Sequence, residues 1–179
     1  IIRTIINVLM QTLFPIAVVC DGKEYTFSQK CIIQDQYGQV PPLAMQPKIR
    51  KLVDAKVRGL DMSITDHNTL LALATSAKNE KWYSRSIWLC KRLHELHNTS
   101  SSSAVILSSC YREMGKPLEA ISATDEYANS GNPVLLTTRA AAYLDINDYP
   151  SAKECLRNAR KFGGRGLQLY LVEKRFRGY

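Results

Sequence analysis

Cys90, His94 and His97 come closest to a reactive or metal-binding constellation in this sequence. Their spacing of i, i+4 and i+7 would place them along one face of a helix. A structural zinc site takes four ligands, usually from two separate segments, and the sequence contains no second pair of this kind. We therefore expect Cys90 to be a core residue and the two histidines to be surface residues, with no metal and no cofactor bound.

The sequence offers no nucleophile with an assembled base. His67, His94 and His97 are the only histidines, and none belongs to a recognisable Ser–His–Asp or Cys–His arrangement. The glycine-rich run at 163–166 superficially resembles a phosphate loop. It follows a helical pattern rather than a strand, which favours a helix stop. We expect the chain not to be an enzyme.

Five cysteines without a CxxC pair indicate reduced thiols rather than a disulfide framework, and hence a cytoplasmic protein. Polar residues interrupt the apolar segment 1–20, so no transmembrane span is expected. The chain starts with Ile rather than Met, and we expect it to be part of a larger protein.

The formal net charge of +8 permits binding to nucleic acid or acidic proteins without selecting either. Basic residues concentrate in the segment 48–58 and towards the C-terminus. They are either solvated helix faces or an anion-binding surface that could contact nucleic acid. The candidates for that surface are Lys48, Arg50, Lys51, Lys174, Arg175 and Arg177.

The first part of the chain combines helical and strand patterns. An apolar stripe predicts an amphipathic helix from residue 2 to residue 13. Asp21-Gly22 lies between two β-rich runs and predicts a hairpin over 16–27. A third short strand is expected at 31–33, followed by a proline-containing loop over 38–46.

The remainder has helical periodicity throughout. A basic helix is expected over 48–58, ended by Gly59. Beyond it, three similar sequence segments align on the small residues Ser86, Ala120 and Ala152, with spacings of 34 and 32 residues. Each segment predicts a helix, a short turn and a second helix. A terminal helix over 167–176 is expected to cap them, with Leu167, Tyr170 and Leu171 facing inward.

These three segments resemble tandem tetratricopeptide repeats over about residues 64–164. The third carries LLTTRAAAYLDINDYPSAKECLRNARK and the second AVILSSCYREMGKPLEAISATDEYANSGNP. The expected fold is mainly α: a solenoid of three helix pairs with a C-terminal capping helix, preceded by a small α/β-hairpin region. The expected domains are 1–46, whose sequence resembles no family that we recognise, and 47–179.

The resemblance implies a protein-interaction module whose first helices line a groove for a partner peptide or helix. Arg112 is the foremost candidate for contacting the partner. The alternative role of its side chain is a salt bridge within the chain, to Glu113 or Asp145. A nucleic-acid-associated accessory domain is the competing function. The expected groove positions are Asn68, Leu71, Thr75, Lys78, Asn79, Ser102, Val105, Ser109, Arg112, Glu113, Val134, Thr137, Ala141, Leu144 and Asp145.

Overall fold

The structure is a computed structural model of the 179-residue chain, and it describes residues 14–28, 30–98 and 100–178. It divides into two compact units, Ile1–Leu89 (unit 1) and Cys90–Tyr179 (unit 2), and each is described by itself. The helix expected over residues 2–13 lies outside the described residues.

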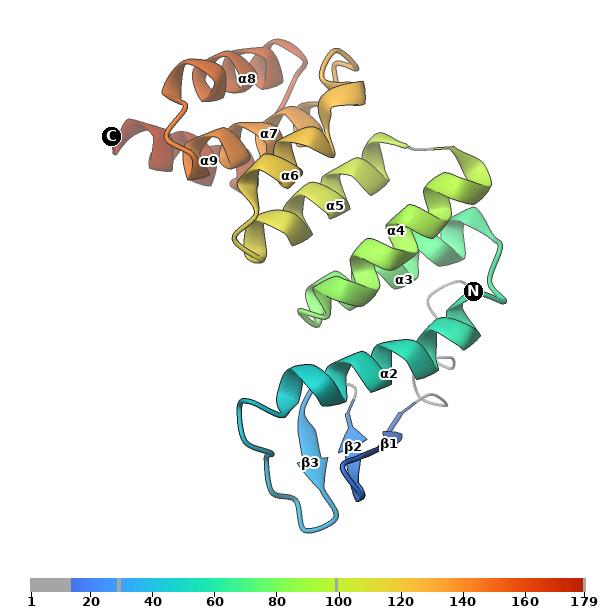
Figure 1. The fold of residues 1–179 in the computed structure, drawn as a ribbon. Helices are drawn as coiled ribbons and strands as arrows, with labels where there is room; N and C mark the ends of the chain where they lie inside the picture. Colours follow the sequence, from blue (N-terminus) through green and yellow to red (C-terminus); the bar gives the residue numbers. More distant parts are fainter. Residues whose placement is uncertain (1–13, 29, 99, 179) are drawn as a thin grey trace. The chain divides into compact units, whose positions relative to one another are not determined.

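Unit 1 contains a small antiparallel sheet in the order β1-β2-β3 (Figure 1). The expected hairpin is confirmed, because Asp21 and Gly22 take positive φ values of 51° and 77° between its strands. The third strand begins two residues later than expected. Cys31 has a φ of 59° and donates its amide to the Ser28 carbonyl, so a turn occupies the predicted start. The strands are β1 (Ile16–Cys20), β2 (Lys23–Phe27) and β3 (Ile33–Asp35).

Helix α2 (Gln46–Asp61) is longer at both ends than the expected helix over 48–58. Pro47 occupies its first turn, where proline is tolerated because the missing N–H has no intrahelical partner. Gly59 does not end the helix, because the chain stays helical as far as Asp61, whose carboxylate is bound by Arg85. The predicted loop therefore stops short of residue 46.

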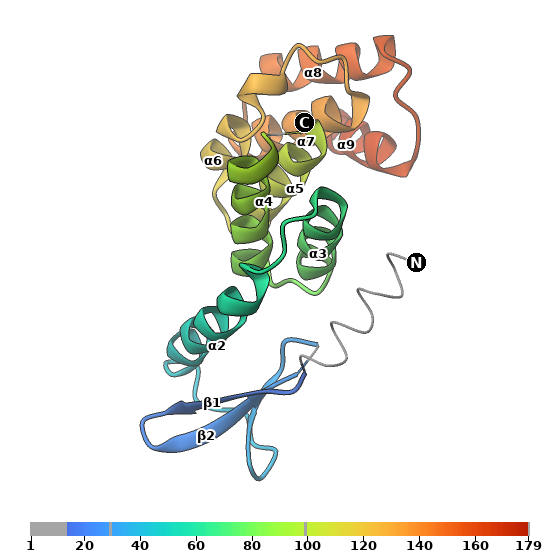
Figure 2. The same cartoon turned by 90° about the vertical axis from the view of Figure 1, so that its right-hand side faces the viewer.

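Helix α2 lies beside the sheet (Figures 1 and 2), and their side chains share one apolar core. Ile49, Val53 and Val57 recur at helical spacing on the buried face of α2. Ala77 and Trp82 belong to the same core. The domain boundary expected at residue 46 therefore falls inside a shared core. The strands contribute Ile16, Val18, Cys20, Tyr25, Phe27 and Ile33.

The rest of the chain consists of helix pairs and a terminal helix, which confirms the expected mainly helical repeat fold. Within residues 14–178, leaving out 29 and 99, eight α-helices are present, and none of them is long and apolar enough to cross a membrane. Beyond α2 these are α3 (His67–Asn79), α4 (Tyr83–His97), α5 (Ser101–Glu113), α6 (Pro117–Ser122), α7 (Pro133–Asp145), α8 (Tyr149–Lys161) and α9 (Leu167–Arg177).

The small residues used to align the repeats lie at helix crossings. Ser86, Ala120 and Ala152 are all fully buried, as expected where a larger side chain would prevent two helices from approaching. Ser86 also donates its hydroxyl to the Ala74 carbonyl at 2.8 Å. This hydrogen bond satisfies the buried hydroxyl of Ser86, which stands where the other two repeats have alanine.

The second helix of the second pair is shorter than the repeat pattern predicts. Helix α6 ends at Ser122, and only a short 3₁₀ turn, η1 (Asp125–Tyr127), follows. Arg139 on α7 donates one guanidinium nitrogen to the Ile121 carbonyl at 3.2 Å and to the Thr124 hydroxyl at 2.9 Å. A partly buried arginine therefore binds the chain where the helix stops.

Helix α9 caps the third pair, but with a different face from the one predicted. Leu167, Tyr170 and Leu171 are exposed, whereas Leu169 is buried. Leu169 packs in the core of α7 and α8, with Val172 and Phe176 partly buried beside it. The inward stripe thus begins two residues later than expected.

Candidate partner-binding site

In unit 2, the first helices of the pairs form one layer together with the cap. Helix α5 packs on α7, and α7 packs on α9, so that α7 lies between the other two. Helix α6 contacts α5 and α7 from the second layer, and α8 contacts α7 and α9. We call the surface of α5, α7 and α9 the inner face of unit 2. It carries the groove positions that the repeat resemblance implies for the second and third pairs.

Two arginines converge on one carboxylate at the C-terminal end of this inner face. Arg112 on α5 donates its Nε to Asp145 Oδ2 at 2.6 Å and its Nη2 to Oδ1 at 3.4 Å. Arg175 on α9 donates its Nη1 to Asp145 Oδ1 at 2.6 Å. The salt bridge that the sequence offered as an alternative for Arg112 is therefore present, and it joins three neighbouring helices.

The cluster carries a net positive charge of one at neutral pH, because two guanidinium groups surround a single carboxylate. Burial raises the pKa of Asp145, but the hydrogen bonds from Arg112 and Arg175 outweigh it and leave the pKa below its ordinary value. Asp145 is therefore ionised throughout the physiological range. All three side chains remain partly accessible to solvent.

The lowered pKa predicts how Asp145 contributes to stability as the pH changes. A group whose pKa is depressed by folding stabilises the folded state above its unfolded pKa, and this contribution disappears as the pH falls through the folded pKa. We expect Asp145→Asn to be less stable than wild type at neutral pH, with the difference shrinking on acidification. Urea unfolding monitored by far-UV circular dichroism at about pH 7 and about pH 3 measures it.

Glu113→Gln is the matched control, because Glu113 is an exposed carboxylate on α5. Its stability difference from wild type should be small and nearly independent of pH. A deficit in Asp145→Asn that is equally large at both pH values would contradict the assigned role of the ionised carboxylate.

Residues 79–159 match the family described as Anaphase-promoting complex, cyclosome, subunit 3, a family of tetratricopeptide-type repeats. The helix pairs are tetratricopeptide-like repeats. This match covers the turn and the second helix of the first repeat and nearly all of the second and third repeats. Searches of the curated proteins and of the solved structures found no match.

The other groove positions of the second and third repeats differ in how far they reach the surface. Ser102, Glu113 and Val134 are exposed, and Val105 and Ser109 are partly buried. Thr137 is buried and donates its hydroxyl to the Pro133 carbonyl at 2.7 Å. It therefore cannot present its side chain to a partner, and the same correction applies to the buried Ala141 and Leu144.

The groove positions of the first repeat lie on α3, in unit 1. Asn68 and Asn79, near the two ends of that helix, are exposed. Leu71, Thr75 and Lys78 are partly buried, and Thr75 donates its hydroxyl to the Leu71 carbonyl at 2.8 Å. This bond within the helix occupies the Thr75 donor.

Most basic side chains of α2 make contacts within unit 1. Lys48 pairs with Asp21, and Lys56 donates to the Ala17 carbonyl. Arg50 lies over the Phe27 ring, and its Nη2 donates to the Cys31 carbonyl at 3.4 Å. Such contacts orient these cations towards the protein, which does not favour a phosphate-binding surface on this helix.

The basic residues of the cap are likewise divided between internal and exposed positions. Arg160 on α8 donates to both carboxylate oxygens of Glu173 on α9, at 2.7 and 2.6 Å. The pair of Arg160 and Glu173 and the contact of Arg175 with Asp145 both join helix α9 to the third repeat. Lys174 and Arg177 remain exposed, as does Lys51 on α2 in unit 1.

The cysteine and histidine residues with helical spacing do not form a common site. Cys90 is buried, whereas His94 and His97 are exposed, so they point to different surroundings on α4. Within the part of the chain that the structure describes, no three His, Cys, Asp or Glu side chains are grouped as metal ligands.

Two arginines with structural roles, Arg85, which is buried, and Arg139, which is partly buried, were not recognised from the sequence. Arg85 makes a bidentate contact with Asp61, at 2.8 and 2.7 Å. No local signal links these residues, which are 24 positions apart. Arg139 lies within the Ala-rich stretch of α7, where a lone charge among small buried residues is itself a signal of an internal partner. Its Nη2 contacts Asp125 at 2.6 Å.

Proposed function

We propose that this chain is a protein-interaction module whose inner face in unit 2 binds an acidic segment of a partner protein. The tetratricopeptide-like repeats support the general class, because such repeats are scaffolds that bind other proteins. The cluster of Arg112, Asp145 and Arg175 supports the acidic character of the partner.

The cluster can accept a further carboxylate without losing its internal pairing. Arg112 uses Nε and Nη2 in its contacts with Asp145, and a guanidinium group has five N–H donors in total. A partner carboxylate at this position would meet two guanidinium groups and one carboxylate, so the net interaction is attractive. Because the site is partly shielded from water, this attraction is stronger than at a fully exposed surface.

The rest of the inner face suits a partner with a mixed surface. Ser102 and Ser109 provide hydroxyl groups along α5, and Val105 between them provides apolar contact area. On α9, the exposed Leu171 lies one helical turn before Arg175. A partner segment that combines acidic and apolar residues would therefore be complementary to this face.

Two substitutions of opposite electrostatic effect test the proposal. The probes are the blocked peptide Ac-LEELLEELLEE-NH2 and its counterpart with every Glu replaced by Gln. We expect Arg112→Gln to weaken binding of the acidic probe by about tenfold, which corresponds to one charge-assisted hydrogen bond. Asp145→Asn should leave its binding unchanged or tighten it, because the cluster then gains positive charge. Titration calorimetry measures both.

Arg157→Gln is the matched control, because it removes one positive charge from α8, where Arg157 is 75% exposed. It should not change the affinity for the acidic probe by more than about twofold. Equal losses in Arg112→Gln and Arg157→Gln would show that only the overall charge matters and would contradict a site on the inner face.

A duplex DNA probe separates this function from the nucleic-acid alternative. Binding through phosphate contacts weakens steeply with salt, with log K falling by about 0.9 per contact for each unit of log salt concentration. We expect the acidic peptide to bind more tightly than the duplex at about 150 mM salt. Tighter binding of the duplex, lost on replacing Lys174 and Arg177 with Ala, would instead favour the nucleic-acid function.

A further inference from the structure

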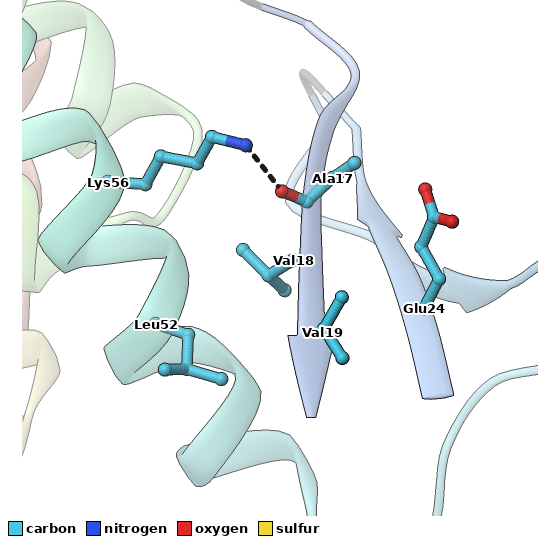
Figure 3. A pocket seen from close by; sticks show the side chains of 6 residues that line it. All are labelled: Ala17, Val18, Val19, Glu24, Leu52 and Lys56. Atoms are coloured by element: carbon cyan, nitrogen blue, oxygen red, sulfur yellow. Dashed lines mark hydrogen bonds between the residues drawn. The ribbon is translucent and has the colours of Figure 1, made fainter. Parts of the chain in front are cut away.

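Strand β1 has an outer edge with which no other strand pairs in the described part of unit 1. Residues of an antiparallel strand alternate between those that bond to their neighbour and those whose backbone groups point away. The Lys56 ammonium donates to the Ala17 carbonyl at 2.8 Å from the side of α2, so this carbonyl points away from β2 (Figure 3). By the same alternation, the N–H and C=O groups of Val19 also point outward.

A surface pocket of about 490 Å³ runs along this edge. Val19 is 65% exposed on the strand, and Leu52 is partly exposed on α2. Figure 3 shows Lys56 and Leu52 on the helix beside the strand. The pocket therefore combines outward backbone groups, apolar side chains, the Lys56 ammonium group and, opposite Val19 on β2, the Glu24 carboxylate. Its lining residues are Ala17, Val18, Val19, Glu24, Leu52 and Lys56.

We propose that this edge binds an extended segment of a partner protein as an added β-strand, with apolar residues of the segment on the face of Val19 and acidic residues on the opposite face, towards α2, at Lys56. Backbone groups that recur every second residue are complementary to another extended backbone. A compact small molecule does not match this spacing.

The position of Lys56 selects an acidic residue in the added strand. A lysine ammonium has three N–H donors, and the Ala17 carbonyl accepts one of them. A carboxylate of the partner could accept from the others. Lys56 also covers the edge in the absence of a partner, as lysines commonly do where an unpaired strand would otherwise favour aggregation.

This second surface is independent of the inner face of unit 2, since every residue that forms it belongs to unit 1. A failure of one proposal therefore leaves the other intact. The variants that test the two surfaces carry substitutions in different units, so their results are distinguishable.

The probe is the blocked peptide Ac-EVEVEV-NH2, titrated into the 179-residue chain and monitored by NMR. We expect hydrogen exchange of the Ala17 and Val19 amides to slow by about tenfold or more at saturation, because both become bonded to the peptide. The amides of Val18 and Cys20 should change little, because they already face β2. A peptide with N-methylated valines tests the need for backbone donors and should bind at least about fivefold more weakly.

Lys56→Gln and Lys51→Gln form a matched pair on α2, since only Lys56 lines the pocket. We expect Lys56→Gln to raise the Kd for the probe by about threefold to fivefold and Lys51→Gln to leave it unchanged. The proposal is overturned if the probe does not bind at millimolar concentration, if both variants weaken it equally, or if exchange at Ala17 and Val19 does not slow.

Discussion

Replacing Arg85 with Met should lower the free energy of unfolding of unit 1 by about 3–5 kcal/mol. The Arg85 and Asp61 side chains are only 5% and 2% exposed, and their contact is bidentate. Loss of the guanidinium group would leave the Asp61 carboxylate buried without its principal partner. Both tryptophans of the chain, Trp82 and Trp88, belong to unit 1, so urea unfolding monitored by tryptophan fluorescence reports on this unit.

A second substitution distinguishes an unpaired charge from lost packing. The double variant Arg85→Met with Asp61→Leu should recover most of the lost stability, because an apolar pair can replace a buried ion pair at little cost. Lys48→Met is the control for an exposed pair, since Lys48 and Asp21 are 60% and 55% exposed, and it should change stability by less than about 1 kcal/mol. A double variant no more stable than Arg85→Met would refute the explanation by an unpaired charge.

Phe27→Ala should lower the free energy of unfolding of unit 1 by about 3–5 kcal/mol. Phe27 is completely buried, and its ring centroid lies 4.8 Å from that of Trp82. Phe27 comes from β2 and Trp82 from the turn between α3 and α4, so the contact joins the sheet to the first repeat. The same fluorescence measurement should show the loss.

Tyr37→Ala is the control for this substitution, because Tyr37 follows β3 and is 79% exposed. Its stability should stay within about 0.5 kcal/mol of wild type. If Phe27→Ala also left the tryptophan transition unchanged, the sheet would not share a core with the first repeat.

Elements specified by short-range signals could be predicted from the sequence. Asp21-Gly22 indicates a hairpin because its backbone requires positive φ values, which these residues tolerate. The recurrence of small residues at Ser86, Ala120 and Ala152 indicates close helix crossings, and all three are buried. In both cases the determining interaction lies within one turn or one helix pair.

Features that depend on more distant contacts were predicted less well. Helix α9 has two apolar stripes, and its sequence alone does not decide which one faces inward. Leu169, Val172 and Phe176 face inward because they pack with Leu136 and Ala140 of α7. The pairing of Arg112 with Asp145 joins residues 33 positions apart, so the sequence could only offer it as one of two alternatives.

The end of α2 illustrates the same limit. Gly59 is a common helix-stop residue, yet the helix continues to Asp61. The buried ion pair with Arg85 fixes the position of Asp61, and that contact involves a residue 24 positions later. A weak local preference for ending the helix at glycine is therefore overcome by a tertiary contact.

Photo-crosslinking from the inner face tests the central claim, that α5, α7 and α9 bind an acidic partner segment, most directly. A benzophenone-bearing residue placed at Ser102 on α5 should crosslink the peptide Ac-LEELLEELLEE-NH2, and excess unlabelled peptide should abolish the product. The same group at Lys153, an exposed position on α8, should give little product. Equal crosslinking from both positions, or more from Lys153, would contradict the account.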